Sequence, residues 1–208
     1  MSVKRFMASQ LRKPHGWFGS LVLSRVMNRV NQQIIDSTVA LLELSPQHHV
    51  LEIGFGGGSG LRQLLERLPQ GEVSGIDFSI DMVQQAKGRF RREIAGGRLR
   101  VQIGDVSRLP FPDGVFDRVF TINTIYFWRD ALQGLGEIRR VLKAGGLTAV
   151  SHRSKEKMEK YAVTKYDFRL FPPHEVADLM RQAGFGDVHV DHQDRDKWTD
   201  QVIVVGKR

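Results

Sequence analysis

Acidic side chains end several apolar runs of the sequence, and a cluster of glycines follows the first of them. Glu52 lies within such a run, and Gly54, Gly56 and Gly58 come directly after it. Leucines then recur at the i, i+3, i+4, i+7 spacing of a helix that buries one face. Glycines between a strand and a helix let backbone N–H groups approach a ligand at the positive end of the helix dipole. The stretch predicts a ligand-binding turn that includes Phe55, with a purely structural turn as the alternative.

The order of the acid and the glycines separates two kinds of nucleotide-binding turn. The dinucleotide fingerprint needs a third glycine where Ser59 stands, which weakens a nicotinamide interpretation. Glu52, Gly54, Gly56 and Gly58 instead match acidic-x-Gly-x-Gly-x-Gly, with the acid inside the strand. This pattern resembles motif I of the class I methyltransferases that depend on S-adenosylmethionine (SAM). The resemblance implies SAM as the cofactor, with Glu52 at its methionine end and the glycines leaving room for it.

Asp77 ends a second apolar run and completes a strand–helix–strand unit. An acid at this point can accept hydrogen bonds from a ribose diol, as in nucleotide-binding folds generally. The alternative is that Asp77 caps the helix predicted over residues 79–94, but Ser79 is expected to supply that cap. Phe78 is placed against the adenine face, and Met82, on the same helix, is included among the cofactor-binding residues.

The third strand, predicted over residues 99–103, runs into the sequence Gly-Asp-Val at residues 104–106, followed by Leu-Pro-Phe-Pro. This stretch resembles the G-D-x…L-P-F motif of the same family, whose acid receives the adenine amino group while the next backbone N–H meets the ring. The resemblance implies these roles for Asp105 and Val106. A simple turn with Asp at its start would look similar in isolation.

The fourth strand, predicted over residues 116–122, leads into Asn123 and the aromatic run 126–128. It borders the point where the strand order reverses in such folds, and a ligand crevice opens there. Asn123 is therefore assigned to the cofactor site. Tyr126 is a candidate catalytic residue that contacts the acceptor or shapes a cage around the sulfonium, although clustered aromatics are more often core. His152 is a candidate general base, with a solvated or structural histidine as the alternative.

The sequence E-I-R-R-V-L-K-A-G-G at residues 137–146 closely resembles the E-x-x-R-V-L-K-P-G-G segment of the ubiquinone and menaquinone type methyltransferases, with Ala144 replacing the usual proline. Its implied role is structural, because it joins a helix over residues 130–142 to a fifth strand over residues 147–151. The features predicted for this helix are a cap by Asp130 and burial of Leu132, Leu135, Ile138 and Leu142.

Two segments are candidates for covering the acceptor. Residues 1–45 form a predicted N-terminal helical lid segment, basic before Asp36, in which Trp17 and Phe18 either close over the pocket or latch onto the core. Its basic amphipathic start is alternatively a membrane-surface helix. Residues 153–171 follow the fifth strand, where this family often builds its substrate cap. The resemblance implies contact with the acceptor for three aromatics, Tyr161, Tyr166 and Phe168.

The alternation of strand and helix patterns predicts an α/β fold. The resemblance implies a Rossmann-like, doubly wound sheet of seven strands that is mainly parallel with an antiparallel last strand. An N-terminal helical segment precedes this sheet, and its second helix is expected to end at Ser45-Pro46. We expect a single SAM-dependent methyltransferase domain over residues 1–208, with the Rossmann-like core over residues 46–208.

Composition limits the remaining classes. The absence of cysteine excludes disulfides and thiolate chemistry. The sequence shows neither an apolar run of about 18 residues nor a signal-peptide core, so we expect a cytoplasmic protein. The net charge of +8 fits either an anionic partner or a solvated surface, and we favour the surface. His189 and His192 lack the spacing of a metal site, so no metal is predicted.

The resemblance implies methyl transfer from SAM to an O, N, C or S atom of a small-molecule acceptor. Positioning and desolvation would carry most of the catalysis, and a base is needed only where the nucleophile holds a proton. A phospholipid or quinone acceptor, with peripheral contact to an anionic membrane, is the alternative. Nucleic acid ranks third, because Asn-Thr-Ile-Tyr at residues 123–126 replaces the N-P-P-Y type tetrapeptide of amino-methylating enzymes. A SAM-binding protein without catalysis is the non-enzymatic alternative, and the oligomeric state is not predicted.

Overall fold

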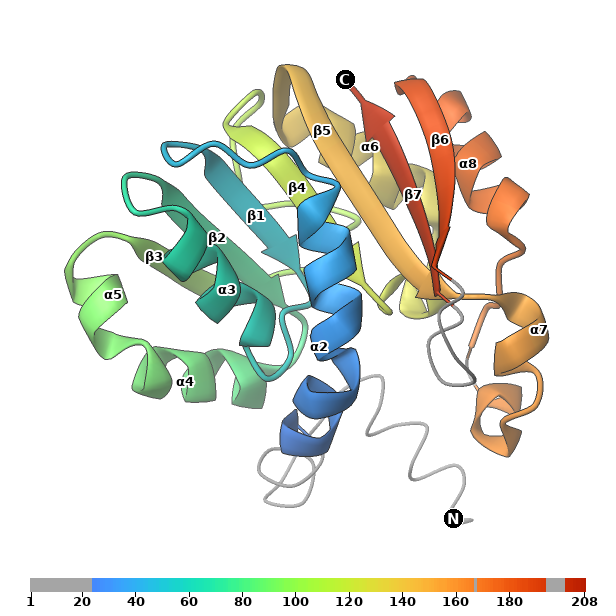
Figure 1. Ribbon diagram of the computed structural model, residues 1–208, viewed down its shortest axis with the longest axis horizontal. Coiled ribbons are helices and arrows are strands. Elements are labelled where there is room, and N and C mark those ends of the chain that lie inside the picture. The colour runs from blue at the N-terminus through green and yellow to red at the C-terminus, as the bar shows by residue number, and fades with distance from the viewer. Residues whose placement is uncertain (1–23, 167, 194–200) are drawn as a thin grey trace.

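The structure is a computed structural model that describes residues 24–166, 168–193 and 201–208, with helices on both faces of a seven-stranded sheet (Figure 1). The strands are β1 (His49–Ile53), β2 (Glu72–Asp77), β3 (Leu99–Ile103), β4 (Phe116–Ile122), β5 (Leu142–Arg153), β6 (Gly186–Gln193) and β7 (Gln201–Lys207). The α-helices are α2 (Ser24–Ala40), α3 (Ser59–Arg67), α4 (Ile80–Arg89), α5 (Arg91–Ala95), α6 (Ala131–Val141), α7 (Lys155–Met158) and α8 (Pro173–Gln182). Short 3-10 turns are η2 (Ile125–Phe127) and η3 (Ala162–Lys165). None of the helices in the described part of the chain is long and apolar enough to cross a membrane.

The order of the strands is β3-β2-β1-β4-β5-β7-β6. Strand β7 pairs antiparallel with both β5 and β6, whereas every pair among β1 to β5 is parallel. This confirms the predicted doubly wound, seven-stranded sheet with an antiparallel last strand. The chain moves outward from β1 to β3 and then returns to the other side of β1 as β4. The strand order therefore reverses between β1 and β4, where open α/β sheets form their ligand crevice.

Two hydrophobic clusters sandwich the sheet, because successive side chains of a strand point to opposite faces. Val50 and Phe120 pack with the cluster formed by α2, α3 and α4. The neighbouring residues Leu51 and Val119 pack with the cluster formed by α6 and α8. All four side chains are fully buried. The central strands β1 and β4 are thus fixed from both faces, and their carboxyl ends are held at constant positions.

The N-terminal helix differs from the prediction. Between residue 24 and β1 the structure has one continuous helix, α2, which ends at Ala40 and not at Ser45-Pro46. The backbone leaves the helix because the carbonyl oxygens of Leu42 and Glu43 accept hydrogen bonds from the Arg118 guanidinium of β4, at 2.5 and 3.2 Å. Leu42 is fully buried in this turn. A contact with a distant strand therefore ends the apolar helical pattern early.

The helix predicted over residues 79–94 is broken at Phe90 into α4 and α5. Phe90 is 2% exposed and lies against the glycine turn, so close that a Cβ at Gly58 would be 2.9 Å from its ring. The guanidinium groups of Arg62 and Arg89 lie over the same ring, at 5.7 and 5.5 Å from its centroid. The helix is interrupted at Phe90, where the aromatic ring is buried.

The junction of α6 and β5 also departs from the prediction. Helix α6 ends at Val141, and β5 already begins at Leu142, which pairs with Phe116 before a register shift. The chain makes the shift through Gly145, whose φ is +75°. Leu132 is 39% exposed because it lies off the buried face of the helix, so its predicted burial is wrong. The predicted cap is confirmed, since the Asp130 carboxylate accepts a hydrogen bond from Gln133 N–H at 3.0 Å.

Candidate functional site

A pocket of about 280 Å³ opens at the carboxyl ends of β1, β2 and β4, where the strand order reverses. Its wall comes from these strand ends, from the loop after β3 and from helix α2. The lining residues are Ile35, residues 52–57, Ser59, Gly60, residues 76–78, residues 104–106, residues 122–124 and residues 127–129. The pocket therefore gathers most of the predicted cofactor-binding residues, which come from four separate segments of the chain.

The glycine turn between β1 and α3 forms the floor of one side. Gly54, Gly56 and Gly58 have φ angles of +73°, +48° and +77°, which side chains rarely adopt. The Gly54 N–H donates a hydrogen bond to the carbonyl of Ile76 at 2.8 Å and ties the turn to β2. A Cβ at Gly54 would collide with the side chain of Thr124, whereas a Cβ at Gly56 would meet no atom within 4 Å. The turn is packed against the protein at Gly54 and open at Gly56.

Glu52 is 4% exposed in the pocket wall, and its Oε2 atom has no hydrogen-bond partner among the described residues. Burial, together with the nearby Asp77 carboxylate, raises the pKa of Glu52 well above its usual range, against the lowering effect of a hydrogen bond from Leu61 N–H. The start of α3 lies close to the Glu52 carboxyl group, since a Cβ at Gly60 would lie 2.6 Å from Glu52 Cδ. A buried acid in this state is stabilised by a ligand that brings hydrogen-bond donors or positive charge.

Asp77 is also buried, but its carboxylate is held by backbone donors. Oδ2 accepts a hydrogen bond from Gly56 N–H and Oδ1 accepts one from Ser79 N–H, both at 2.8 Å. Burial raises the pKa of Asp77, and the N–H groups of Ser79, Gly56 and Phe78 partly offset this effect. Ser79 is the N-cap residue of α4, as predicted, but its side chain makes no capping hydrogen bond. Three N–H donors leave about one of the four lone-pair sites of the carboxylate for a further donor such as a ribose hydroxyl.

The loop after β3 presents Asp105 and Val106 in the same wall. Asp105 Oδ1 accepts a hydrogen bond from Ser107 N–H at 2.8 Å, and its carbonyl accepts one from Arg108 N–H at 3.1 Å. Val106 is 7% exposed, and the Phe78 ring, half exposed, lines the pocket as well. This part of the wall can accept a hydrogen bond from a planar amine and cover its ring with apolar atoms.

The part of the wall that follows β4 is largely apolar. Phe127 and Trp128 line it, and the Trp128 indole N–H donates a hydrogen bond to the Thr124 hydroxyl at 3.1 Å. Asn123 adopts a φ of +57° in the turn that carries these residues out of the strand. Arg129, which is exposed, is the only basic side chain in this pocket lining as the structure describes it. We call the segments that carry Glu52, Asp77 and Asp105 the acidic wall, and the segment that carries Phe127 and Trp128 the aromatic wall.

Tyr126 and His152, the two candidate catalytic residues, lie in the core beside the pocket and not in its wall. The Tyr126 hydroxyl accepts a hydrogen bond from Arg153 N–H at 2.5 Å and donates one to Asn123 Oδ1 at 3.2 Å. His152 is fully buried, with Nδ1 3.0 Å from the Arg153 carbonyl oxygen and its ring edge-on to Tyr126. These contacts fix the ends of β4 and β5 relative to each other. The catalytic roles stay predictions, and the placement speaks for a structural role.

Other predicted site residues lie behind the wall. Met82 is 1% exposed in the core and Gly58 faces the Phe90 ring, so neither lines the pocket. In the segment after β5, Tyr161 and Phe168 pack on the core, and the Phe168 ring lies 4.7 Å from that of Phe127. The segment therefore supports the aromatic wall from behind, and its half-buried Tyr166 is likewise absent from the lining. The lid predicted from Trp17 and Phe18, and the basic start of the chain, lie outside the described residues.

Sequence reasoning missed twelve residues of the lining, among them Ile35, Gly60, Thr124 and Arg129. Ile35 reaches the pocket from α2, and only the packing of that helix on the sheet places it there. Thr124, Gly60 and Arg129 each lie within six residues of a predicted site residue. Their proximity to the motifs was the available signal, but it did not show which side chain turns inward. Tertiary contacts alone decide this.

Comparisons with known proteins agree with this geometry. Residues 50–146 match the family model described as "Methyltransferase domain". The uncharacterized methyltransferase YdaC of Bacillus subtilis is 28% identical over 82% of this chain and 89% of its own length. The demethylmenaquinone methyltransferase of Roseiflexus castenholzii is 29% identical over 73% of this chain and 74% of its own length. A SAM dependent methyltransferase of Aquifex aeolicus has the same fold, with a TM-score of 0.70 and 22% identity over 83% of this chain and 88% of that one.

Proposed function

We propose that this chain, which belongs to the class I SAM-dependent methyltransferases, methylates a small-molecule acceptor bound against the aromatic wall of the pocket. The observation that carries the proposal is the arrangement of three carboxyl groups around one pocket, at the ends of β1 and β2 and in the loop after β3. The glycine turn lies between the first two of these groups. When bound, SAM supplies a methyl group on a sulfonium that already activates it for transfer.

The residues of the acidic wall fit this cofactor. Glu52 carries a buried oxygen that has no hydrogen-bond partner among the described residues, which suits the ammonium of the methionine part. We assign the ribose diol to Asp77 and the adenine to Asp105 and Val106. All three residues line the same pocket. The open space at Gly56 leaves room for the cofactor to approach the backbone. Phe78 and Asn123 complete the proposed contacts.

The protein's own contribution to catalysis would be position and exclusion of water. Phe127, Trp128 and Ile35 bring apolar surface to the pocket wall. Such a wall holds a flat or apolar acceptor and removes water from the nucleophile. In the lining that the structure describes, histidine, tyrosine, lysine and cysteine are absent. We therefore propose an acceptor whose nucleophilic atom needs no strong base from the wall.

A quinone or phospholipid acceptor at a membrane surface is the second candidate. It is supported by the similarity to a demethylmenaquinone methyltransferase and by the basic residues of positions 1–30. Binding to vesicles that contain anionic lipid is the measurement. We expect the binding to be lost on deletion of residues 1–30 if this candidate holds. Vesicle binding that survives the deletion would contradict the proposed role of the N-terminal segment.

Calorimetric titration with SAM and with S-adenosylhomocysteine tests the cofactor assignment. We expect micromolar binding to the natural chain and at least about a tenfold loss for Asp77→Ala, because the ribose contact is a hydrogen bond to a charged group. Glu72→Ala is the matched control, since Glu72 is an exposed acid at the opposite end of the same strand. Absence of binding to both ligands, or equal binding by Asp77→Ala, would overturn the assignment.

A further inference from the structure

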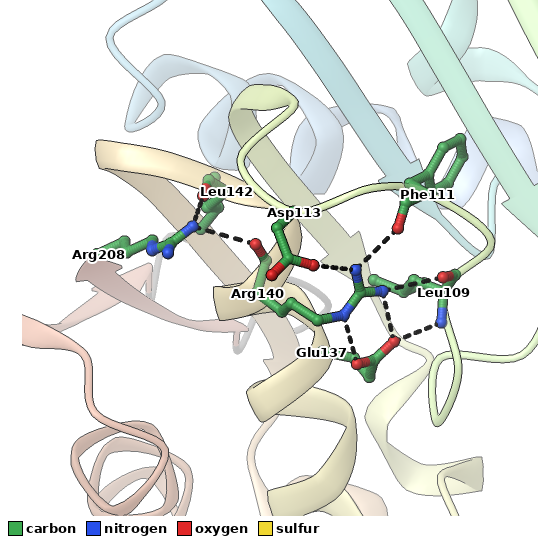
Figure 2. Close-up of polar contacts among 7 residues, drawn as sticks. All are labelled: Leu109, Phe111, Asp113, Glu137, Arg140, Leu142 and Arg208. Atoms are coloured by element: carbon green, nitrogen blue, oxygen red, sulfur yellow. Dashed lines mark hydrogen bonds and ion pairs between the residues drawn. The ribbon is translucent and has the colours of Figure 1, made fainter.

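A stripe of polar side chains on α6 faces the loop that carries Asp105 and Val106. Gln133, Glu137 and Arg140 are spaced i, i+4 and i+7, so they share one side of the helix. In the sequence, Glu137 and Arg140 belong to the segment whose role was expected to be structural. Figure 2 shows both side chains extending from α6 to the loop, where their contacts meet the backbone.

The stripe forms hydrogen bonds with backbone groups of every second residue of the loop, from Ser107 to Phe111. Glu137 Oε2 accepts a hydrogen bond from Leu109 N–H at 2.8 Å, and Arg140 Nη2 donates to the Leu109 carbonyl at 3.0 Å. Arg140 Nη1 donates to the Phe111 carbonyl at 2.8 Å, and Gln133 Nε2 donates to the Ser107 carbonyl at 3.1 Å. Both polar groups of one loop residue, Leu109, are therefore bound to the same pair of side chains (Figure 2).

The pair itself has a rigid geometry. Arg140 Nε and Nη2 donate to the two oxygens of Glu137 at 2.7 and 2.8 Å, as a bidentate fork. Arg140 lowers the pKa of Glu137, and the hydrogen bonds that Arg140 donates to Glu137 and Asp113 raise the pKa of Arg140. The side chains of Arg140 and Glu137 are only 30% and 19% exposed. A lysine could supply the charge but not the planar fork that reaches two carbonyl groups.

Asp105 is linked to this anchor through a short stretch of turn. Its carbonyl accepts a hydrogen bond from Arg108 N–H, which directly precedes Leu109. Val106 also packs against α6, since a Cβ at Gly134 would lie 3.3 Å from its Cγ1. Helix α6 therefore contacts the loop at both Val106 and Leu109. Few degrees of freedom remain for Asp105 between these two points.

We propose that the Glu137–Arg140 pair positions Asp105 and Val106 and thereby sets the selectivity of the pocket for a purine that carries an exocyclic amino group. This inference rests on the proposed function, because Asp105 and Val106 are assigned to adenine there. Glu137 and Arg140 are positioning residues, since neither lines the pocket. Their loss should therefore change which base is preferred and not only how tightly any ligand binds.

The test compares S-adenosylhomocysteine with S-inosylhomocysteine, which has a carbonyl oxygen in place of the amino group. We expect the natural chain to prefer the adenosine compound by about tenfold or more in Kd, as for a hydrogen bond to a charged acceptor. In Arg140→Ala and Arg140→Lys this preference should fall at least about threefold. Arg181→Ala is the matched control, because Arg181 forms an i,i+3 ion pair on α8 away from the pocket.

Amide hydrogen exchange supplies a readout that does not depend on ligand. Exchange of the Leu109 amide should accelerate in Arg140→Ala and stay unchanged in Arg181→Ala. An unchanged preference in folded Arg140 variants would overturn the inference and leave the cofactor assignment standing. Failure of the natural chain to bind or to distinguish the two compounds would overturn both. If Arg140→Ala does not fold, Glu137→Gln, which keeps the side-chain size, is tested instead. The same ratio of the two Kd values then supports or overturns the inference.

Discussion

The two walls of the pocket are built in different ways. In the acidic wall, Asp77 and Asp105 each accept a hydrogen bond from the backbone N–H two residues later, so short stretches of chain organise them. In the aromatic wall, Phe127 packs against Phe168, which lies in the segment after β5. The acidic wall depends on strand ends and turns, whereas the aromatic wall depends on distant segments. This difference supports the proposal that the acidic wall holds the cofactor and the aromatic wall the acceptor.

The largest expected effect concerns Glu52 in the acidic wall. Glu52→Gln should weaken SAM binding by more than about a hundredfold, because removing one partner of a buried charge pair costs about 3–5 kcal/mol. Calorimetry with SAM measures this loss. The control ligand is 5′-methylthioadenosine, which lacks the amino-acid part and should bind both proteins alike. Equal SAM affinity in the variant and the natural chain would contradict the assignment of Glu52 to the cofactor site.

The same substitution has the opposite effect on the unliganded fold. The pKa of Glu52 is raised in the folded state, so ionisation there is opposed by burial, and stability falls as pH rises above the ordinary pKa of about 4.5. Glu52→Gln removes this loss. Its thermal midpoint should exceed that of the natural chain at pH 8, and the difference should shrink as pH falls toward 5. A difference that grows toward low pH would show that the sign is wrong.

The junction between the walls is tested next. Gly54→Ala should lower the free energy of unfolding by about 2–4 kcal/mol, because positive φ strain adds to the collision of the new Cβ with Thr124. Gly97→Ala is the matched control, since Gly97 has a φ of +74° but no atom within 4 Å of a Cβ. It should lose only about 1 kcal/mol. If urea unfolding gives similar losses of unfolding free energy for Gly54→Ala and Gly97→Ala, the Thr124 side chain can move away from the new Cβ, and the two walls are not tightly joined.

The smallest expected effect is in the support of the aromatic wall. Phe168→Ala removes a half-buried ring and its edge-on contact with Phe127, which should cost about 1–2 kcal/mol of folding stability. Because Phe168 packs on the rings of Tyr126 and Phe127 and does not line the pocket, the Kd for S-adenosylhomocysteine should change less than about twofold, within the scatter of independent sites. Thermal unfolding and calorimetry measure the two quantities. A large loss of cofactor affinity would show that the walls do not act independently.

The sequence could predict the acidic wall because its signals are local. Strand ends, turn glycines and acids at fixed offsets place Glu52, Asp77 and Asp105, and the sheet itself follows from the family resemblance. It could not predict the aromatic wall, since Tyr126 and Phe127 are neighbours in one short turn and only tertiary packing buries the first and exposes the second to the pocket. The break at Phe90 had the same cause, a contact formed across the fold.

The antiparallel strand β7 also constrains how the protein reaches its fold. Residues 201–207 pair on both sides, with β5 and with β6, and most of them are buried. A nascent chain that lacks them would leave an open edge on β5 and no partner for β6, so the sheet can close only after this segment has left the ribosome. Such late, long-range pairing slows folding, and until it occurs the unpaired edge of β5 is a surface on which chains can aggregate.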